Sequence, residues 1–122
     1  MEIFSITHIN SLKDLYNKGS FEQIIKACSS TDISKFNFAQ LTVLAKAYKE
    51  IQNFKLALSY AEVANRLQNS TECCLIIAQC HTSLQNFCDA YYAWEICDQL
   101  YPNDYYTKIY LAVCACELRK FN

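Results

Sequence analysis

The sequence predicts an all-α fold, a solenoid of antiparallel helix pairs stacked one on the next. Phenylalanine recurs at positions 21, 54, 87 and 121, at intervals of 33, 33 and 34 residues, which is the spacing of stacked helical repeats. The 122 residues include one glycine and one proline, so the chain has little material for β-turns and much for uninterrupted helices. With 52% hydrophobic residues it can bury a core, and we expect a single domain over residues 1–122.

The first predicted helix covers residues 5–18, where apolar residues recur three and four apart. Gly19 ends it. Ser20 and Gln23 match a capping box at the start of a second helix. A polar run over residues 29–32 then predicts a break before the next helix.

The second and third pairs follow the same plan. Apolar residues from Phe38 to Tyr48 share one helix face, and Asn53 caps the helix that follows. In the third pair Ser70 starts the first helix and Asn86 caps the second.

The fourth unit contributes one predicted helix, from Tyr105 to about Leu118, after the segment Pro102-Asn103-Asp104 ends the helix before it. The array therefore has about three and a half repeats. The predicted units cover residues 5–37, 38–70, 71–104 and a truncated 105–122.

This pattern resembles the tetratricopeptide repeat (TPR), a helix-turn-helix unit of similar length. The resemblance implies a right-handed α-solenoid with small residues where two helices pass closely. Four alanines match those positions: Ala45, Ala57, Ala78 and Ala90. The first unit departs from the pattern, because Leu12 and Ile24 stand where the family prefers small residues.

Two narrower resemblances stay open. The run Leu75-Ile76-Ile77-Ala78-Gln79-Cys80, with Ala61-Glu62 before it, is similar to the N-terminal repeats of TPR subunits of the anaphase-promoting complex, which implies self-association within a larger complex. A small, nearly self-contained array also resembles the TPR chaperones of type III secretion, which cradle a partner helix.

The TPR resemblance implies a concave groove, lined by the first helix of each unit, that binds a partner peptide or helix. The implied groove residues are Ile9, Lys13, Tyr16, Thr42, Lys46, Lys49, Leu75, Gln79, Tyr106, Ile109 and Val113, with Ile6, Thr82 and Cys116 on the same face. The three lysines are either a solvated helix face or a site for an acidic stretch of the partner. The apolar residues toward the C-terminal end indicate a partner site or the seat of a further repeat.

Some TPR domains hold the C-terminal carboxylate of a chaperone tail with Lys, Asn and Arg at set groove positions. In one register these positions are Ile9, Lys13, Val43, Glu72 and Ile76. One unit further on they are Thr42, Lys46, Ile76, Tyr106 and Tyr110. Neither set assembles such a clamp, so we expect a partner of another kind.

The last predicted helix is apolar on more than one face. Its apolar residues include Ile109, Tyr110, Leu111, Val113 and Cys114. Because a solenoid end needs a polar cap, we expect this end to be covered by further repeats, by a second copy in a homodimer, or by a partner in a larger complex.

The eight cysteines are expected to be packing residues, because no Cys-x-x-Cys occurs and free cysteine behaves as a small hydrophobe inside helices. The positions where a metal or redox role would show are Cys73, Cys80, Cys114 and Cys116. His8 and His81 fall in different units, and His81 corresponds to Tyr48, which predicts packing. We expect no enzyme, no metal and no cofactor, since no catalytic motif is present.

Charge excludes further classes of function. The 11 basic and 12 acidic residues offer no reason to expect nucleic acid or an anionic membrane. RNA binding of the pentatricopeptide kind is the least favoured alternative, because it requires a basic groove. No apolar run reaches the length of a membrane span, and we expect an intracellular, cytoplasmic protein.

Overall fold

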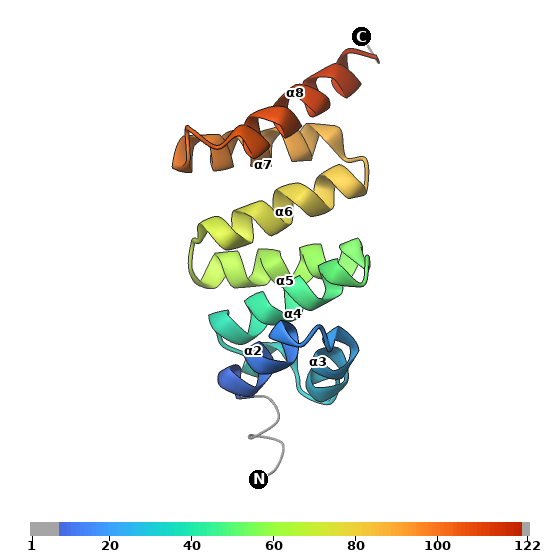
Figure 1. The fold of residues 1–122 in the computed structure, drawn as a ribbon, viewed down its shortest axis with the longest axis vertical. Coiled ribbons are helices and arrows are strands. Elements are labelled where there is room, and N and C mark those ends of the chain that lie inside the picture. Colours follow the sequence, from blue (N-terminus) through green and yellow to red (C-terminus); the bar gives the residue numbers. More distant parts are fainter. Residues whose placement is uncertain (1–7, 121–122) are drawn as a thin grey trace.

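The computed structural model describes residues 8–120, and this range contains seven α-helices, one short 3₁₀ helix and no strand (Figure 1). The all-α prediction is therefore confirmed. The elements are α2 (Ile9–Asn17), α3 (Phe21–Cys28), the 3₁₀ helix η1 (Ile33–Lys35), α4 (Phe38–Glu50), α5 (Phe54–Leu67), α6 (Thr71–Ser83), α7 (Phe87–Leu100) and α8 (Tyr105–Arg119). No pattern in the sequence predicted η1. The helix predicted over 5–18 appears as α2, and Ser5 and Ile6 lie outside the described residues.

The helices stack in chain order from the N-terminal to the C-terminal end (Figure 1). Each helix from α4 to α8 packs against the one before it, and α4 also contacts α6, the first helix of the next pair. This is the predicted solenoid of antiparallel pairs, in which each pair buries its apolar faces on its neighbours.

The same turn closes each pair. Gly19, Gln52 and Gln85 stand at the middle of three-residue connections with φ of 75°, 68° and 64°. These left-handed residues lie in Schellman motifs, in which the next residue's N–H reaches back five residues to a helix carbonyl. The three bonds are Ser20 N to Leu15 O, Asn53 N to Tyr48 O and Asn86 N to His81 O, each 2.9 Å long. Glycine adopts this conformation without a steric cost, whereas Gln52 and Gln85 are strained in it.

Side-chain caps fix the starts of several helices. The Oδ1 atom of Asn53 accepts from Leu56 N at 3.4 Å, and the Ser70 hydroxyl accepts from Cys73 N at 3.0 Å, which confirms both predicted caps. Sequence analysis missed the one complete capping box that α4 has, in which Asn37 and Gln40 bond each other's backbone N–H at 2.9 Å.

Two predicted caps are wrong. Ser20 and Asn86 occupy N-cap positions, but neither side chain bonds the backbone of its helix. The backbone of Ser20 has ψ of 59°, whereas Ser70 is extended with ψ of 149°, and a short hydroxyl reaches the first turn only from the extended conformation. The Asn86 amide lies instead 3.5 Å from His81 Nδ1.

This difference predicts unequal effects of removing two serines. Ser70→Ala should lower the free energy of unfolding by about 1 kcal/mol, because it removes a helix-capping bond. Ser20→Ala is the matched control, and it should change that free energy by less than about 0.5 kcal/mol, as for a surface substitution. Urea unfolding followed by circular dichroism measures both, and equal losses would contradict the assignment of caps.

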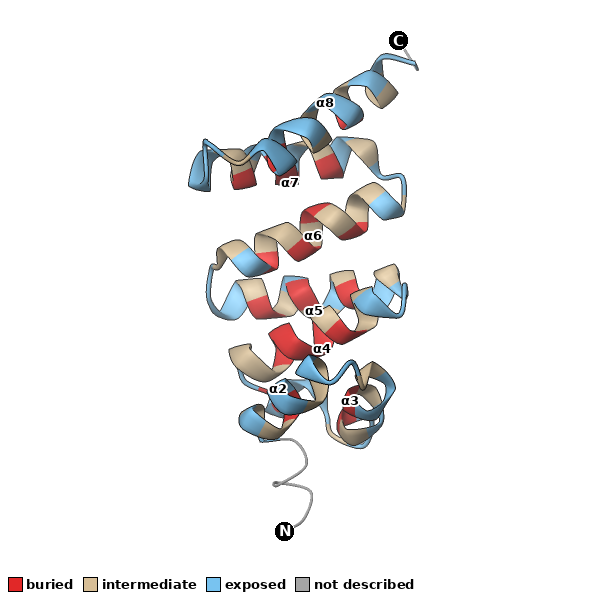
Figure 2. Cartoon of the chain, viewed as in Figure 1, coloured by how far each residue is buried: buried red, intermediate tan, exposed pale blue. Residues whose placement is uncertain are grey.

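Alanines form the contact between the helices of each later pair. Ala45, Ala57, Ala78 and Ala90 are each 0% exposed, as predicted from their close-approach positions. Buried residues line the inner faces of α4 to α7 in Figure 2. Small side chains let the helix backbones approach, so the adjoining large residues pack against one another.

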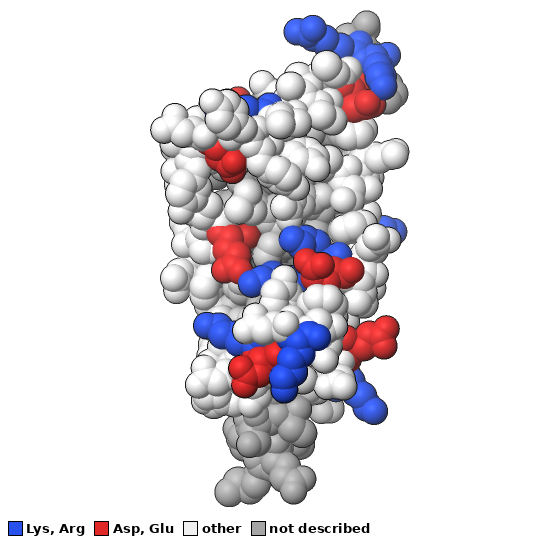
Figure 3. All heavy atoms as spheres, in the orientation of Figure 1, with Lys and Arg blue, Asp and Glu red and all other residues white. Residues whose placement is uncertain are grey.

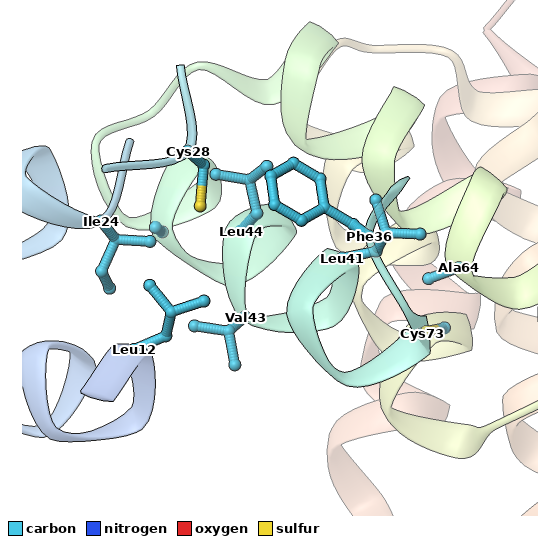
Figure 4. Packing of buried hydrophobic residues seen from close by; sticks show 10 residues of the cluster. Leu12, Ile24, Cys28, Phe36, Leu41, Val43, Leu44, Ala64 and Cys73 are labelled. Atoms are coloured by element: carbon cyan, nitrogen blue, oxygen red, sulfur yellow. The ribbon is translucent and has the colours of Figure 1, made fainter. Parts of the chain in front are cut away.

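The N-terminal pair packs differently. Leu12 and Ile24, both fully buried, fill the close-approach positions with large side chains and meet Leu44 and Phe36 in one cluster (Figure 4). In Figure 1, α3 is seen close to end-on while α4 to α7 run across the view. Large side chains thus take the place that alanines have at the later crossings, as the sequence of this unit predicted.

Candidate partner-binding groove

The first helices of the units, α2, α4, α6 and α8, present one continuous face. Lys46 links three of them, because its Nζ lies 4.5 Å from the ring centroid of Tyr16 on α2 and 2.8 Å from Glu72 Oε1 on α6. Lys49 Nζ donates to Gln79 Oε1 at 2.8 Å, again joining α4 to α6. The structure therefore places Tyr16 beside Lys46 and Lys49 beside Gln79, four members of the predicted set.

These contacts bear on the two interpretations of the lysines. Lys46 and Lys49 are half-buried and each has a partner on α6, so they tie neighbouring units together. Lys13 is exposed, which suits a solvated helix face. The Tyr16 hydroxyl donates to Glu50 Oε1 at 3.4 Å, and burial together with that carboxylate raises the pKa of Tyr16 above its ordinary value. The Tyr16 hydroxyl is therefore a neutral hydrogen-bond donor in this half of the groove.

A hollow of about 360 Å³ opens in the N-terminal half, lined in part by Lys13, Tyr16 and Glu72. Thr42 forms part of its wall but offers no free polar group, since it is 5% exposed and its hydroxyl donates to Phe38 O at 2.8 Å. Ile9 is half-buried and packs against the N-terminal core.

The C-terminal half of the groove is apolar and open. Tyr106, Ile109 and Val113 on α8 are 47%, 60% and 41% exposed. In Figure 3 charged side chains gather over the lower and middle parts of this face and again at the C-terminal tip of α8, whereas the surface between them is mostly uncharged. Beside it, Leu75 and Tyr101 line a hollow of about 640 Å³ between the start of α6 and the loop before α8.

The exposed apolar surface at the C-terminal end of the chain is smaller than the sequence predicted. Tyr110 is half-buried and stacks on Trp94 with ring centroids 5.0 Å apart, Leu111 packs on the same cluster, and Cys114 is 0% exposed. These three residues pack against α7, so they need no further repeat to cover them. Ala112 is exposed, in contrast, although Ala78, the corresponding residue 34 positions earlier, is fully buried against the next helix.

The positions that would form a carboxylate clamp do not present one. Val43 and Ile76 are 5% and 2% exposed, and Glu72 places a carboxylate at another of these positions. That carboxylate also takes up Lys46 in an ion pair.

Most of the cysteines are packing residues. The buried ones are Cys28, Cys73, Cys80, Cys97 and Cys114; Cys74 is half-buried, and Cys88 and Cys116 are exposed. Burial raises the pKa of Cys28 and of Cys80 to about 11 and that of Cys97 to about 12. Within residues 8–120, no three His, Cys, Asp or Glu side chains gather as a metal site requires.

The histidines lie apart, as expected. His8 is exposed, and its Nδ1 accepts from Asn10 N at 3.2 Å at the start of α2. His81 is half-buried on α6.

Thiol alkylation tests this arrangement, because only the thiolate reacts and it must be reached by solvent. We expect iodoacetamide at pH 8 to label Cys88 and Cys116 rapidly and Cys97 only after the chain is unfolded. Mass spectrometry of the digested protein locates each label. Labelling of Cys97 in the folded chain at the rate of Cys116 would contradict the packing described above.

No helix in the described part of the chain is both long and apolar enough to cross a lipid bilayer.

Comparison with known proteins identifies the fold. No protein-family model matches the sequence, and no curated protein matches it either. Several solved structures are similar, and two of them are TPR domains. The first TPR domain of human RPAP3, determined by NMR, has a TM-score of 0.77 and 18% identity over 97% of this chain and 94% of its own. The first TPR of Spaghetti (RPAP3), bound to the HSP90 peptide SRMEEVD, has a TM-score of 0.73 and 19% identity over 90% of this chain and 91% of its own.

The chain has the TPR fold. The predicted right-handed solenoid of about three and a half helix pairs is therefore confirmed. In TPR terms α4, α6 and α8 are the first helices of units two to four. The resemblance to the anaphase-promoting complex and to secretion chaperones stays a prediction.

Proposed function

We propose that this chain is a protein-interaction adaptor that binds a peptide or helix of a partner in its concave groove. The observation that carries the proposal is the exposed apolar surface of Tyr106, Ile109 and Val113, continuous with the paired polar residues of α4 and α6. Exposed apolar side chains gathered on a concave face mark a partner site more often than a solvated one.

The charges of the groove favour an apolar segment over an acidic chain end. The Spaghetti domain is bound to an acidic peptide, SRMEEVD. Here Lys46 is neutralised by Glu72 at 2.8 Å, so a carboxylate entering the N-terminal hollow would meet a carboxylate already in place. Such a ligand would have to displace that ion pair and desolvate Glu72, which is unfavourable. An apolar side chain set against Ile109 and Val113 needs neither step.

Selection from a phage-displayed library of random peptides tests the proposal, with affinities of the recovered peptides measured by calorimetry. Ile109→Glu should weaken their binding at least tenfold, about 1.4 kcal/mol, because it sets a charge in the apolar half of the groove. Leu67→Glu is the matched control, since Leu67 on α5 is also 60% exposed and lies outside the groove.

Two results would overturn the proposal. One is recovery of peptides with acidic C-termini whose binding depends on Lys13 and not on Ile109. The other is equal affinity of the parent chain and the Ile109→Glu variant for every recovered peptide.

A second candidate, self-association through the face of α8 that lacks a following helix, is favoured by the exposure of Ala112. Light scattering over a concentration series measures it, with Ala112→Lys as the variant that should dissociate a dimer. Tyr110→Glu is unsuitable, because Tyr110 packs on Trp94 and its loss would disturb the fold. A monomer at every concentration would remove this candidate. No observation specifically favours the secretion-chaperone or RNA-binding alternatives.

A further inference from the structure

A second elongated hollow lies between α5 and α7, with α6 as its floor. It consists of adjoining cavities of about 210 and 410 Å³, and Asn65, Cys74 and Ile96 line both. The floor uses a face of α6 that carries Cys74, Ile77 and His81, whereas the concave groove uses Leu75 and Gln79. We call this hollow the α5–α7 channel.

One wall of the channel is an apolar stripe on α7. Tyr92, Ile96 and Leu100 follow one another at intervals of four, so they lie on one side of the helix and span about 12 Å. Tyr92 is 67% exposed and Leu100 is 51% exposed. Single exposed apolar residues need no explanation, but a stripe of them along a hollow does.

The other wall, on α5, is polar. Glu62 and Asn65 line it, and Asn69 continues it past the end of the helix. Asn65 uses its Oδ1 to accept from Ser70 N at 3.3 Å, which leaves its amide N–H groups to donate to a ligand. Side-chain amides beside an apolar wall suit an extended segment, whose backbone groups are free, better than a helix, whose backbone groups bond each other.

The two ends of the channel differ in charge. Glu62 and Asp89 line the smaller cavity, and no Lys or Arg lines either cavity. Within residues 8–120 neither carboxylate takes part in an ion pair, unlike Glu72 in the concave groove. The opposite end, at Leu100, carries no charge in its lining.

We propose that the α5–α7 channel docks an extended partner segment with a lysine or arginine at one end and a large aliphatic residue at the other. The cationic side chain lies between Glu62 and Asp89, and the aliphatic one fills the larger cavity against Ile96 and Leu100. The span of about 12 Å corresponds to roughly three to four residues of extended chain. Charge complementarity sets the direction in which the segment binds.

The α5–α7 channel is separate from the concave groove, so it is tested in a variant whose groove is expected to bind weakly. A phage-displayed library of random peptides is selected against the Ile109→Glu variant, and the recovered peptides are measured against further variants of that chain. The recovered sequences should carry Lys or Arg three or four residues from Leu, Ile or Met. Adding Glu62→Lys should weaken their binding at least tenfold, whereas adding Glu95→Lys, an exposed acidic residue of α7 outside the channel, should change it less than twofold.

Cysteine protection locates the bound peptide. Because Cys74 lines both cavities, the peptide should slow alkylation of Cys74 and leave that of Cys88 and Cys116 unchanged. The proposal is overturned if the basic and aliphatic pattern is not enriched, if Glu62→Lys leaves affinity unchanged, or if Cys74 is not protected. Each of these results can occur whether or not the concave groove binds its own ligand, so the two proposals fail independently.

Discussion

Replacing Trp94 by alanine should lower the free energy of unfolding by about 3–5 kcal/mol, the largest effect we expect of any single substitution in this chain. Trp94 is 0% exposed and its indole stacks on Tyr110 at 5.0 Å, with Tyr106 edge-on at 6.0 Å. Its Nε1 donates to Thr82 Oγ1 at 2.9 Å. The indole therefore holds α6, α7 and α8 together, and its removal leaves a cavity that these helices cannot close without moving.

Urea unfolding followed by far-UV circular dichroism measures this loss. Tyr92→Ala is the matched control, because Tyr92 is an exposed aromatic residue of the same helix, and it should change the free energy of unfolding by less than about 0.5 kcal/mol. Hydrogen exchange adds a local readout, since amides of α8 should lose protection more than amides of α4. A loss below about 1 kcal/mol for Trp94→Ala would contradict the central place of the indole in the C-terminal core.

Ala78→Leu should cost about 1–3 kcal/mol, because a larger side chain at a close helix crossing forces the neighbouring backbones apart. Ala78 is 0% exposed and belongs to the cluster that contains Ala90 and Trp94. The corresponding position in the next unit, Ala112, is exposed. The same substitution there, Ala112→Leu, should change the free energy of unfolding by less than about 0.5 kcal/mol.

The two substitutions place leucine at corresponding repeat positions. Ala78 is covered by the next helix and Ala112 is not. Urea unfolding measures both variants, and light scattering checks that Ala112→Leu has not created a dimer. Equal destabilisation by the two substitutions would mean that Ala112 is covered in solution, and it would favour the self-associated form. Tolerance of leucine at Ala78 would contradict the close crossing of α6 and α7.

Several features followed from local chemistry and were predicted correctly. Asn53 and Ser70 cap their helices because a short polar side chain next to a helix start has few better partners. The alanines at the crossings are recognisable because only small residues let two helices approach at a fixed repeat position. The burial of Cys80 and Cys97 was predicted because a free cysteine inside a helix behaves as a small hydrophobic residue.

The errors concern residues whose role depends on distant neighbours. Ser20 has the sequence of a cap, but its backbone has ψ of 59°, and from this conformation its short hydroxyl does not bond the first turn of α3. Tyr110 was predicted to belong to an apolar end that something else must cover, yet it stacks on Trp94 of the preceding helix. The ion pair between Lys46 and Glu72 joins residues of different repeats, and no local pattern indicates it.

By itself, the sequence determined the period of the array, the helical class, the close-approach alanines and the face that each first helix presents, because these depend on residues within one turn or one repeat. Only the tertiary structure decided which members of that face are free. Lys46 and Lys49 are bonded to side chains of α6, so their charges are less available to a ligand of the groove. Tyr110 stacks on Trp94, so less apolar surface is exposed at the end of the chain. The α5–α7 channel likewise exists only once three helices from two repeats are packed side by side.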